Sequence, residues 1–205
     1  MAQINWGEDI QNFFNNDLAK MVTNLFKFPT NCLAKINEVC KVKSIVLPLM
    51  TLVVSYIVST LMFLIMGIDF GGSAKMALLP VFFVAFLCIL TFGVLAAKGK
   101  SDINIALNHT TVHSLIFTVF IIVIALFVLI SGNGVKAVFN ILGSGFWAVF
   151  IILAITYGLS LGISSMRQLM KDNLPGNDNF AWWISPCVVV VSLALAVFIS
   201  VKMGF

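Results

Sequence analysis

The sequence predicts an all-α polytopic membrane protein with five transmembrane helices. Two observations predict this fold. Of the 205 residues, 60% are hydrophobic and only 10% are charged, which is typical of a chain whose solvent is mostly lipid. The chain also contains five apolar stretches without any Lys, Arg, Asp, Glu or His, at residues 44–66, 77–97, 115–130, 141–163 and 184–201.

The length of each stretch supports a membrane crossing. A bilayer core of about 30 Å requires about 20 apolar helical residues. Four stretches have 18 to 23 residues, and the third has 16. We extend the third stretch back to Val112, which is tolerable at an interface, so the third span is predicted at 112–130. The chain then divides into a cytoplasmic or interfacial segment, 1–43, and a transmembrane domain, 44–205.

The basic residues predict the orientation. In a five-span chain, residues 1–43, 98–114 and 164–183 share one side of the membrane and carry nine Lys and Arg, whereas the other side carries three. Cytoplasmic loops carry the excess of basic residues in membrane proteins. We therefore expect a cytoplasmic N-terminus and an external C-terminus. The residue usage, without a secretory signal sequence, is compatible with a bacterial plasma (inner) membrane.

The segment before the first span has the pattern of an amphipathic helix that ends at Phe28-Pro29. Its apolar positions recur at steps of three and four: Ile10, Phe13, Phe14, Leu18, Met21, Val22, Leu25 and Phe26. Its polar positions are Gln11, Asn12, Asn15, Asn16, Asp17, Lys20 and Asn24. A second short helix is expected before Lys41.

Two interpretations of these N-terminal helices stay open. They are either an interfacial anchor whose apolar face lies in the headgroup region, or a docking face for a cytoplasmic protein partner or for the same helices of another subunit. The polar face is rich in Asn and Gln and nearly balanced in charge. Lipid-binding helices are usually more basic, so this composition favours a protein partner.

Small residues at four-residue spacing predict which spans pack closely. Spans one, four and five carry such stripes: Thr51, Ser55 and Ser59; Ala154, Gly158 and Gly162; Ser192, Ala196 and Ser200. We expect these three spans at the centre of the bundle. The stripes serve either packing within one subunit or a homo-oligomer interface. Span three is rich in large apolar residues and is expected to face lipid.

Few residues point to chemistry. His109 and His113 form an HxxxH pair that could hold a metal on a helix, but no further ligand lies near in sequence, so a solvated loop or helix end is the favoured interpretation. No catalytic constellation or nucleotide-binding loop is present, and we predict no enzyme activity, no cofactor and no metal. The net charge of +4 is ordinary for juxtamembrane lysines, and we predict no nucleic-acid binding.

The layout resembles the Yip1-type membrane proteins, particularly their bacterial members. The similar features are the Phe-Pro stretch 25–30 followed by Leu33 and Ile36, five closely spaced spans, and the turn Gly99-Lys100-Ser101. Family members often have Tyr and Pro at the entry to span three, where this chain has His113 and no proline. The resemblance implies a membrane adaptor without catalytic residues. Eukaryotic relatives bind small GTPases in vesicle traffic, an interaction that we do not transfer to this chain.

These observations lead to one favoured function and one alternative. The favoured function is a non-enzymatic membrane scaffold or sensor that recruits a cytoplasmic partner through the N-terminal helices and the 164–183 loop. The alternative is a subunit of an oligomeric channel or permease, whose pore would be lined by hydroxyls such as Ser55, Ser59, Thr156 and Ser160.

Overall fold

The computed structural model describes residues 4–27, 40–42, 45–100, 102–131 and 145–204. The all-α prediction is confirmed for these residues, because they form helices joined by short turns and contain no strand. The elements are α1 (Trp6–Asn12), the π-helical turn η1 (Phe13–Asp17), α2 (Leu18–Lys27), α4 (Val46–Ile65), α5 (Phe70–Met76), α6 (Leu78–Ala97), α7 (Ile103–Ser131), α9 (Gly145–Asn173) and α10 (Asp178–Lys202).

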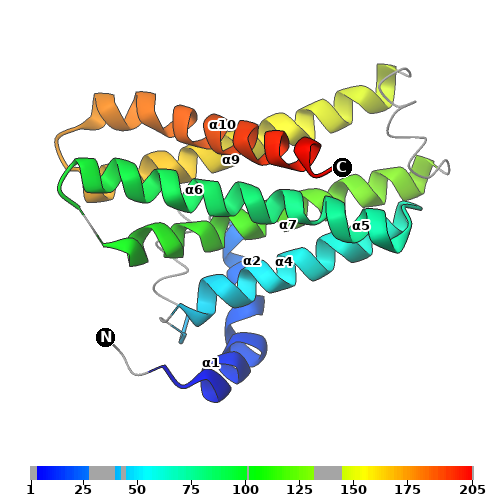
Figure 1. The fold of residues 1–205 in the computed structure, drawn as a ribbon, viewed down its shortest axis with the longest axis horizontal. Helices are drawn as coiled ribbons and strands as arrows, with labels where there is room; N and C mark the ends of the chain where they lie inside the picture. Colours follow the sequence, from blue (N-terminus) through cyan, green and yellow to red (C-terminus); the bar gives the residue numbers. More distant parts are fainter. Residues whose placement is uncertain (1–3, 28–39, 43–44, 101, 132–144, 205) are drawn as a thin grey trace.

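The five longest helices of the described residues are α4, α6, α7, α9 and α10. They lie side by side with their axes roughly along one direction, and the α1–η1–α2 segment crosses them steeply (Figure 1). α7 is the central helix, because it packs against α4, α6, α9 and α2. α10 completes the bundle by packing against α6 and α9.

The expectation that span three faces lipid is therefore wrong. The reason is a stripe of small side chains on α7 that begins before the predicted span. Ala106, Ser114 and Thr118 are all buried, and small residues allow helix backbones to approach closely. The apolar side chains on the other faces of α7, such as Phe117 and Phe120, are partly buried against neighbouring helices.

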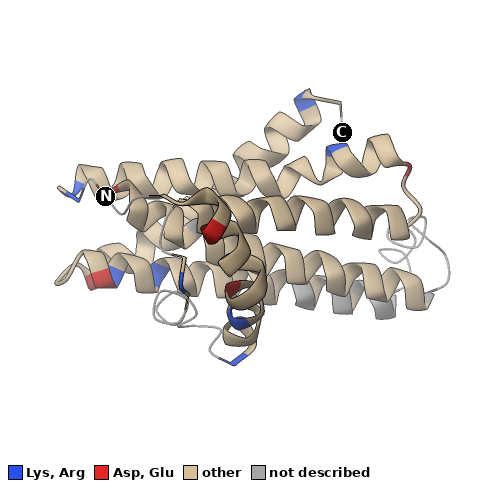
Figure 2. Cartoon of the chain, turned by 90° about the horizontal axis from the view of Figure 1, so that it is seen from below, with Lys and Arg blue, Asp and Glu red and all other residues tan. Residues whose placement is uncertain are grey.

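The helices are compatible with a helical membrane protein that contacts the bilayer. In the part of the chain that is described, four segments are long and apolar enough to cross a membrane: α4, α5 with α6, α7 and α10. α9 contains most of the predicted fourth span, whose residues 141–144 lie outside the described ranges. Charged side chains are found at the ends of the bundle and on the transverse N-terminal helix (Figure 2).

Three helices are longer than the predicted spans. α7 begins nine residues before residue 112, α9 continues ten residues beyond 163, and α10 begins six residues before 184. The predicted loops 98–114 and 164–183 are therefore mostly helical. Their side chains still find partners in the bundle, since Ala106, Met170 and Ala181 are fully buried. Hydropathy finds the lipid-crossing part of a helix and misses an extension that is buried against protein.

The turn after α6 is tight. Gly99 has φ +81°, and the Lys100 amide donates to the Leu95 carbonyl oxygen over 2.9 Å. This is a Schellman-type helix end, which requires a left-handed residue and therefore favours glycine. The turn sends the chain directly back as α7.

Candidate functional site

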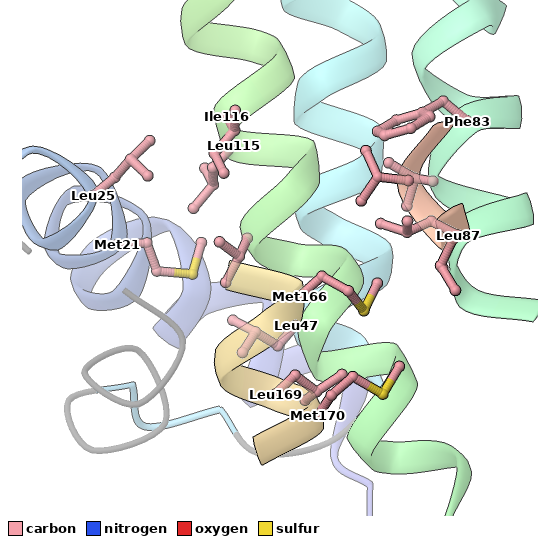
Figure 3. Close-up of a cluster of buried hydrophobic side chains, with 14 of the residues drawn as sticks. Met21, Leu25, Leu47, Phe83, Leu87, Leu115, Ile116, Met166, Leu169 and Met170 are labelled. Atoms are coloured by element: carbon pink, nitrogen blue, oxygen red, sulfur yellow. The ribbon is translucent and has the colours of Figure 1, made fainter. Parts of the chain in front are cut away.

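The N-terminal helix is attached to the bundle along its apolar stripe. Phe13, Met21 and Leu25 are buried, and Figure 3 shows Met21 and Leu25 beside Leu115 and Ile116 of α7. Ile10, Leu18 and Val22 are partly buried against the same core. The apolar face of this helix was the candidate contact surface for a partner, but most of it is covered by the protein's own bundle. Only Phe14 and Phe26 are mainly exposed among its candidate residues Ile10, Phe13, Phe14, Leu18, Met21, Leu25 and Phe26. The second predicted short helix lies outside the described residues.

A buried carboxylate completes this attachment. Asp17 is 0% exposed, and its two oxygens accept hydrogen bonds from the backbone amides of Lys41, at 3.0 Å, and Val42, at 2.8 Å. Backbone donors of this kind stabilise a buried carboxylate without a counter-ion. Asp17 therefore joins the N-terminal helix to the chain that leads into α4. The prediction that Asp17 lies on the polar face is wrong.

The inner face of α7 is polar where it meets α4 and α9. The Thr118 hydroxyl lies 2.8 Å from Ser55 Oγ and 2.7 Å from the Ser114 carbonyl oxygen. The Ser55 hydroxyl also lies within 3.4 Å of that carbonyl oxygen. These three residues form a hydroxyl seam that joins α4 to α7, which satisfies polar groups away from water.

One helical turn towards the start of α7, two histidines are buried together. The rings of His109 and His113 have centroids 4.4 Å apart, and the side chains are 0% and 2% exposed. The expectation of a solvated loop or helix end is wrong, because α7 begins at Ile103 and carries both rings inside the bundle. A pair of ionisable side chains is therefore buried in the bundle, although the five apolar stretches of the sequence contain no ionisable residue.

The two rings differ in their partners. His113 Nδ1 lies 3.3 Å from the His109 carbonyl oxygen, and Nε2 lies 3.2 Å from the Gly162 carbonyl oxygen. Neither nitrogen of His109 has a hydrogen-bond partner among the described residues. No group of three His, Cys, Asp or Glu side chains that could hold a metal occurs in those ranges.

His113 lies at the wall of a cavity of about 220 Å³ between α6, α7, α9 and α10. Phe83, Phe117 and Phe120 supply aromatic surface, and Leu193 lies on the α10 side. The other wall residues are Ile116, Ile121, Ile124, Ile155, Gly158, Leu159, Gly162 and Val189. His113 is thus the one polar side chain among the described residues that line this cavity.

The predicted packing stripes lie as follows. On α4 and α10, Thr51, Ser55, Ser59, Ser192, Ala196 and Ser200 are all buried. On α9, Gly158 and Gly162 face α7: a Cβ added at Gly158 would lie 2.5 Å from Phe120 Cε2, and one at Gly162 would lie 3.3 Å from His113 Nε2. The side chain of Ala154 lies outside the described part of the chain.

The four hydroxyls of the alternative pore are not brought together. Ser55 and Ser59 are buried on α4, whereas Thr156 and Ser160 are exposed on α9. They do not line one passage within the described chain.

Comparison of the chain with models of protein families, with curated proteins and with solved structures gives no match. The site is therefore interpreted from its geometry.

Asp17 and the histidine pair are the polar groups whose buried position the sequence interpretation missed. Asp17 is four residues from both Phe13 and Met21, so helical spacing already places it on the apolar stripe. The four-residue spacing of His109 and His113 likewise placed both on one face. The sequence pattern did not show that α7 begins at Ile103, which places both histidines inside a helix of the bundle.

Proposed function

We propose that this protein is a non-enzymatic integral membrane scaffold or sensor subunit that anchors a cytoplasmic partner protein on its transverse N-terminal helix. The observation that carries the proposal is the attachment of this helix by Asp17 and by its apolar stripe. Because that stripe is already occupied by the protein's own bundle, the helix presents its polar face outward in a fixed orientation.

The outward face has the composition of a protein-binding surface. Gln11, Asn15, Lys20 and Thr23 are exposed, and the aromatic ring of Phe14 is 50% exposed beside them. Uncharged polar groups with an exposed aromatic ring suit contacts with another protein. The same face has few cations for anionic lipid.

The end of the α9–α10 hairpin is a second, smaller surface for this proposal. The Arg167 guanidinium stacks 3.6 Å from the centroid of the Trp182 ring, and Lys98 lies 4.5 Å from the centroid of Phe180. Cation–π contacts of this kind contribute roughly 0.5–2 kcal/mol each. They hold the hairpin in place beside the end of α6.

In this proposal α9 is the fourth of five spanning helices, the N-terminus is cytoplasmic and the C-terminus is external, in a bacterial plasma membrane. The nine-to-three distribution of basic residues supports this orientation. The resemblance to Yip1-type proteins supports an adaptor role.

The experiment is site-specific photo-crosslinking in cells with the full chain. A photoreactive residue at Asn15, on the outer face of the N-terminal helix, should capture a protein partner. The same residue at Thr156, which is exposed on α9, serves as the matched control and should not capture it.

The variant that combines Gln11→Arg and Asn15→Arg should reduce co-purification of that partner at least tenfold without changing the protein's abundance, because both side chains are exposed. Retention of every co-purifying protein after deletion of residues 1–40 would contradict the proposal.

A further inference from the structure

The cavity beside His113 has the composition of a lipid-binding site. Its described wall residues are apolar or glycine apart from His113, and such cavities exclude water. Its volume of about 220 Å³ exceeds the roughly 150 Å³ that suffices for benzene in an engineered apolar cavity. One ring or a short length of hydrocarbon chain fits inside it.

The cavity reaches the lipid-facing surface of the bundle. Ile155, one of its wall residues, is 44% exposed, and Phe120 and Leu193 are partly exposed. An amphiphile can therefore enter from the side and leave the rest of its chain in the bilayer. No passage from water is required.

His113, the polar side chain of the cavity wall, determines which polar group the ligand must carry. Both nitrogens of His113 lie near carbonyl oxygens, of His109 at 3.3 Å and of Gly162 at 3.2 Å. An uncharged imidazole has one N–H, so only one of these two contacts has a proton. The other nitrogen faces its carbonyl oxygen without a proton between them, so this nitrogen lacks a donor. A ligand hydroxyl supplies one, whereas a ligand that only accepts does not.

We propose that the cavity between α6, α7, α9 and α10 binds a membrane lipid or isoprenoid that carries a free hydroxyl, with its apolar part against Phe83, Phe117 and Phe120 and its hydroxyl donating to His113 or to the Gly162 carbonyl oxygen. The site is separate from the polar face of the N-terminal helix. It therefore succeeds or fails independently of partner binding.

The test uses three photoreactive probes on the purified full chain in lipid nanodiscs: a ten-carbon alcohol with a diazirine close to its hydroxyl end, its methyl ether and the matching alkane. Peptide mapping should place the alcohol on cavity residues of α6 and α10. Labelling there by the alcohol should exceed labelling by the ether and the alkane about tenfold, since only the alcohol donates a hydrogen bond.

Two substitutions localise the effect. Leu193→Trp fills the cavity and should abolish labelling, whereas Leu195→Trp, on the exposed side of α10, should leave it unchanged. His113→Phe retains a ring without the nitrogens and should reduce alcohol labelling about tenfold, to the level of the alkane.

Equal labelling by the alcohol and the ether would overturn the assignment of a hydrogen-bond-donating head group. This comparison uses the unmodified protein, so it does not depend on how His113→Phe folds. Labelling that is unchanged by Leu193→Trp would overturn the site itself.

Discussion

At the scale of single residues, Asp17 decides how the N-terminal helix is held. Its carboxylate bonds two amides that precede α4, and hydrogen bonds to a charged group contribute roughly 1.5–3 kcal/mol. Asp17→Asn keeps the shape and replaces one acceptor oxygen by a donor.

We expect Asp17→Asn to loosen the N-terminal helix and leave the bundle intact. Hydrogen exchange of residues 6–27 should accelerate about 10- to 100-fold, which corresponds to a loss of roughly 1.5–3 kcal/mol. Exchange in α7 should not change. Glu8→Gln, at an exposed position, is the control. Unchanged exchange in the N-terminal helix would show that its apolar stripe holds it alone.

A second prediction concerns Gly158. Gly158→Ala places a Cβ 2.5 Å from the Phe120 ring, and overpacking of this kind destabilises by about 1–3 kcal/mol. Gly93→Ala is the matched control, since its Cβ meets no atom within 4 Å. Thermal unfolding should show a lower Tm for Gly158→Ala alone. Adding Phe120→Leu to Gly158→Ala should restore the Tm. If the Tm does not recover, the strain does not come from the contact with Phe120.

A third prediction concerns His109, whose two buried nitrogens lack partners among the described residues. Removing an unsatisfied buried polar group recovers about 1–3 kcal/mol. His109→Leu should therefore stabilise the protein in reversible SDS unfolding. A loss of stability would reveal a polar partner for this ring, and His113→Leu, which removes a hydrogen-bonded ring, is the comparison.

Sequence reasoning at this scale located apolar stripes better than the polar groups that interrupt them. The steps that placed Phe13 and Met21 on one face also placed Asp17 there, yet charge alone assigned it to the polar face. Its bonding partners, the Lys41 and Val42 amides, lie 24 and 25 residues away. A local pattern does not contain that contact.

At the scale of elements, the hydroxyl seam is a polar link between α4 and α7. Bonds of this kind between membrane helices average about 0.6 kcal/mol and reach about 1.7 kcal/mol. Thr118→Val should therefore destabilise the protein by about 0.5–2 kcal/mol in SDS unfolding. Thr156→Val, on the exposed face of α9, should change it by less than about 0.5 kcal/mol. Equal effects would mean that the seam contributes nothing specific.

The helices themselves were predictable, and their extents and neighbours were less so. Apolar length identified α4, α6 and the apolar part of α10. It did not identify α7 as the central helix, because the stripe with Ala106 and Ser114 begins in a segment that was expected to be a loop. A helix face buried against protein can carry small or polar residues, whereas a face in lipid carries large apolar ones. Hydropathy averages over both faces and does not distinguish them.

At the scale of the whole molecule, the orientation is directly testable. In a chain without its native cysteines, single cysteines at Lys20 and Lys100 should react with a membrane-impermeant maleimide only after the membrane is opened. Cysteines at Lys75 and Gly204 should react in intact cells, because the proposed five spans would place them outside. Labelling of Lys20 and Gly204 from the same side would contradict an odd number of spans.

The position of the N-terminal helix also has a consequence for synthesis. Leu25 packs beside Ile116 of α7, which leaves the ribosome about 90 residues later, after roughly 5–20 s at the usual rate of translation. During that interval the apolar stripe has no native partner. The headgroup layer of the membrane is the nearest host that can cover it. We therefore expect the helix to lie in the headgroup layer first and to transfer to the bundle only once α7 has been inserted.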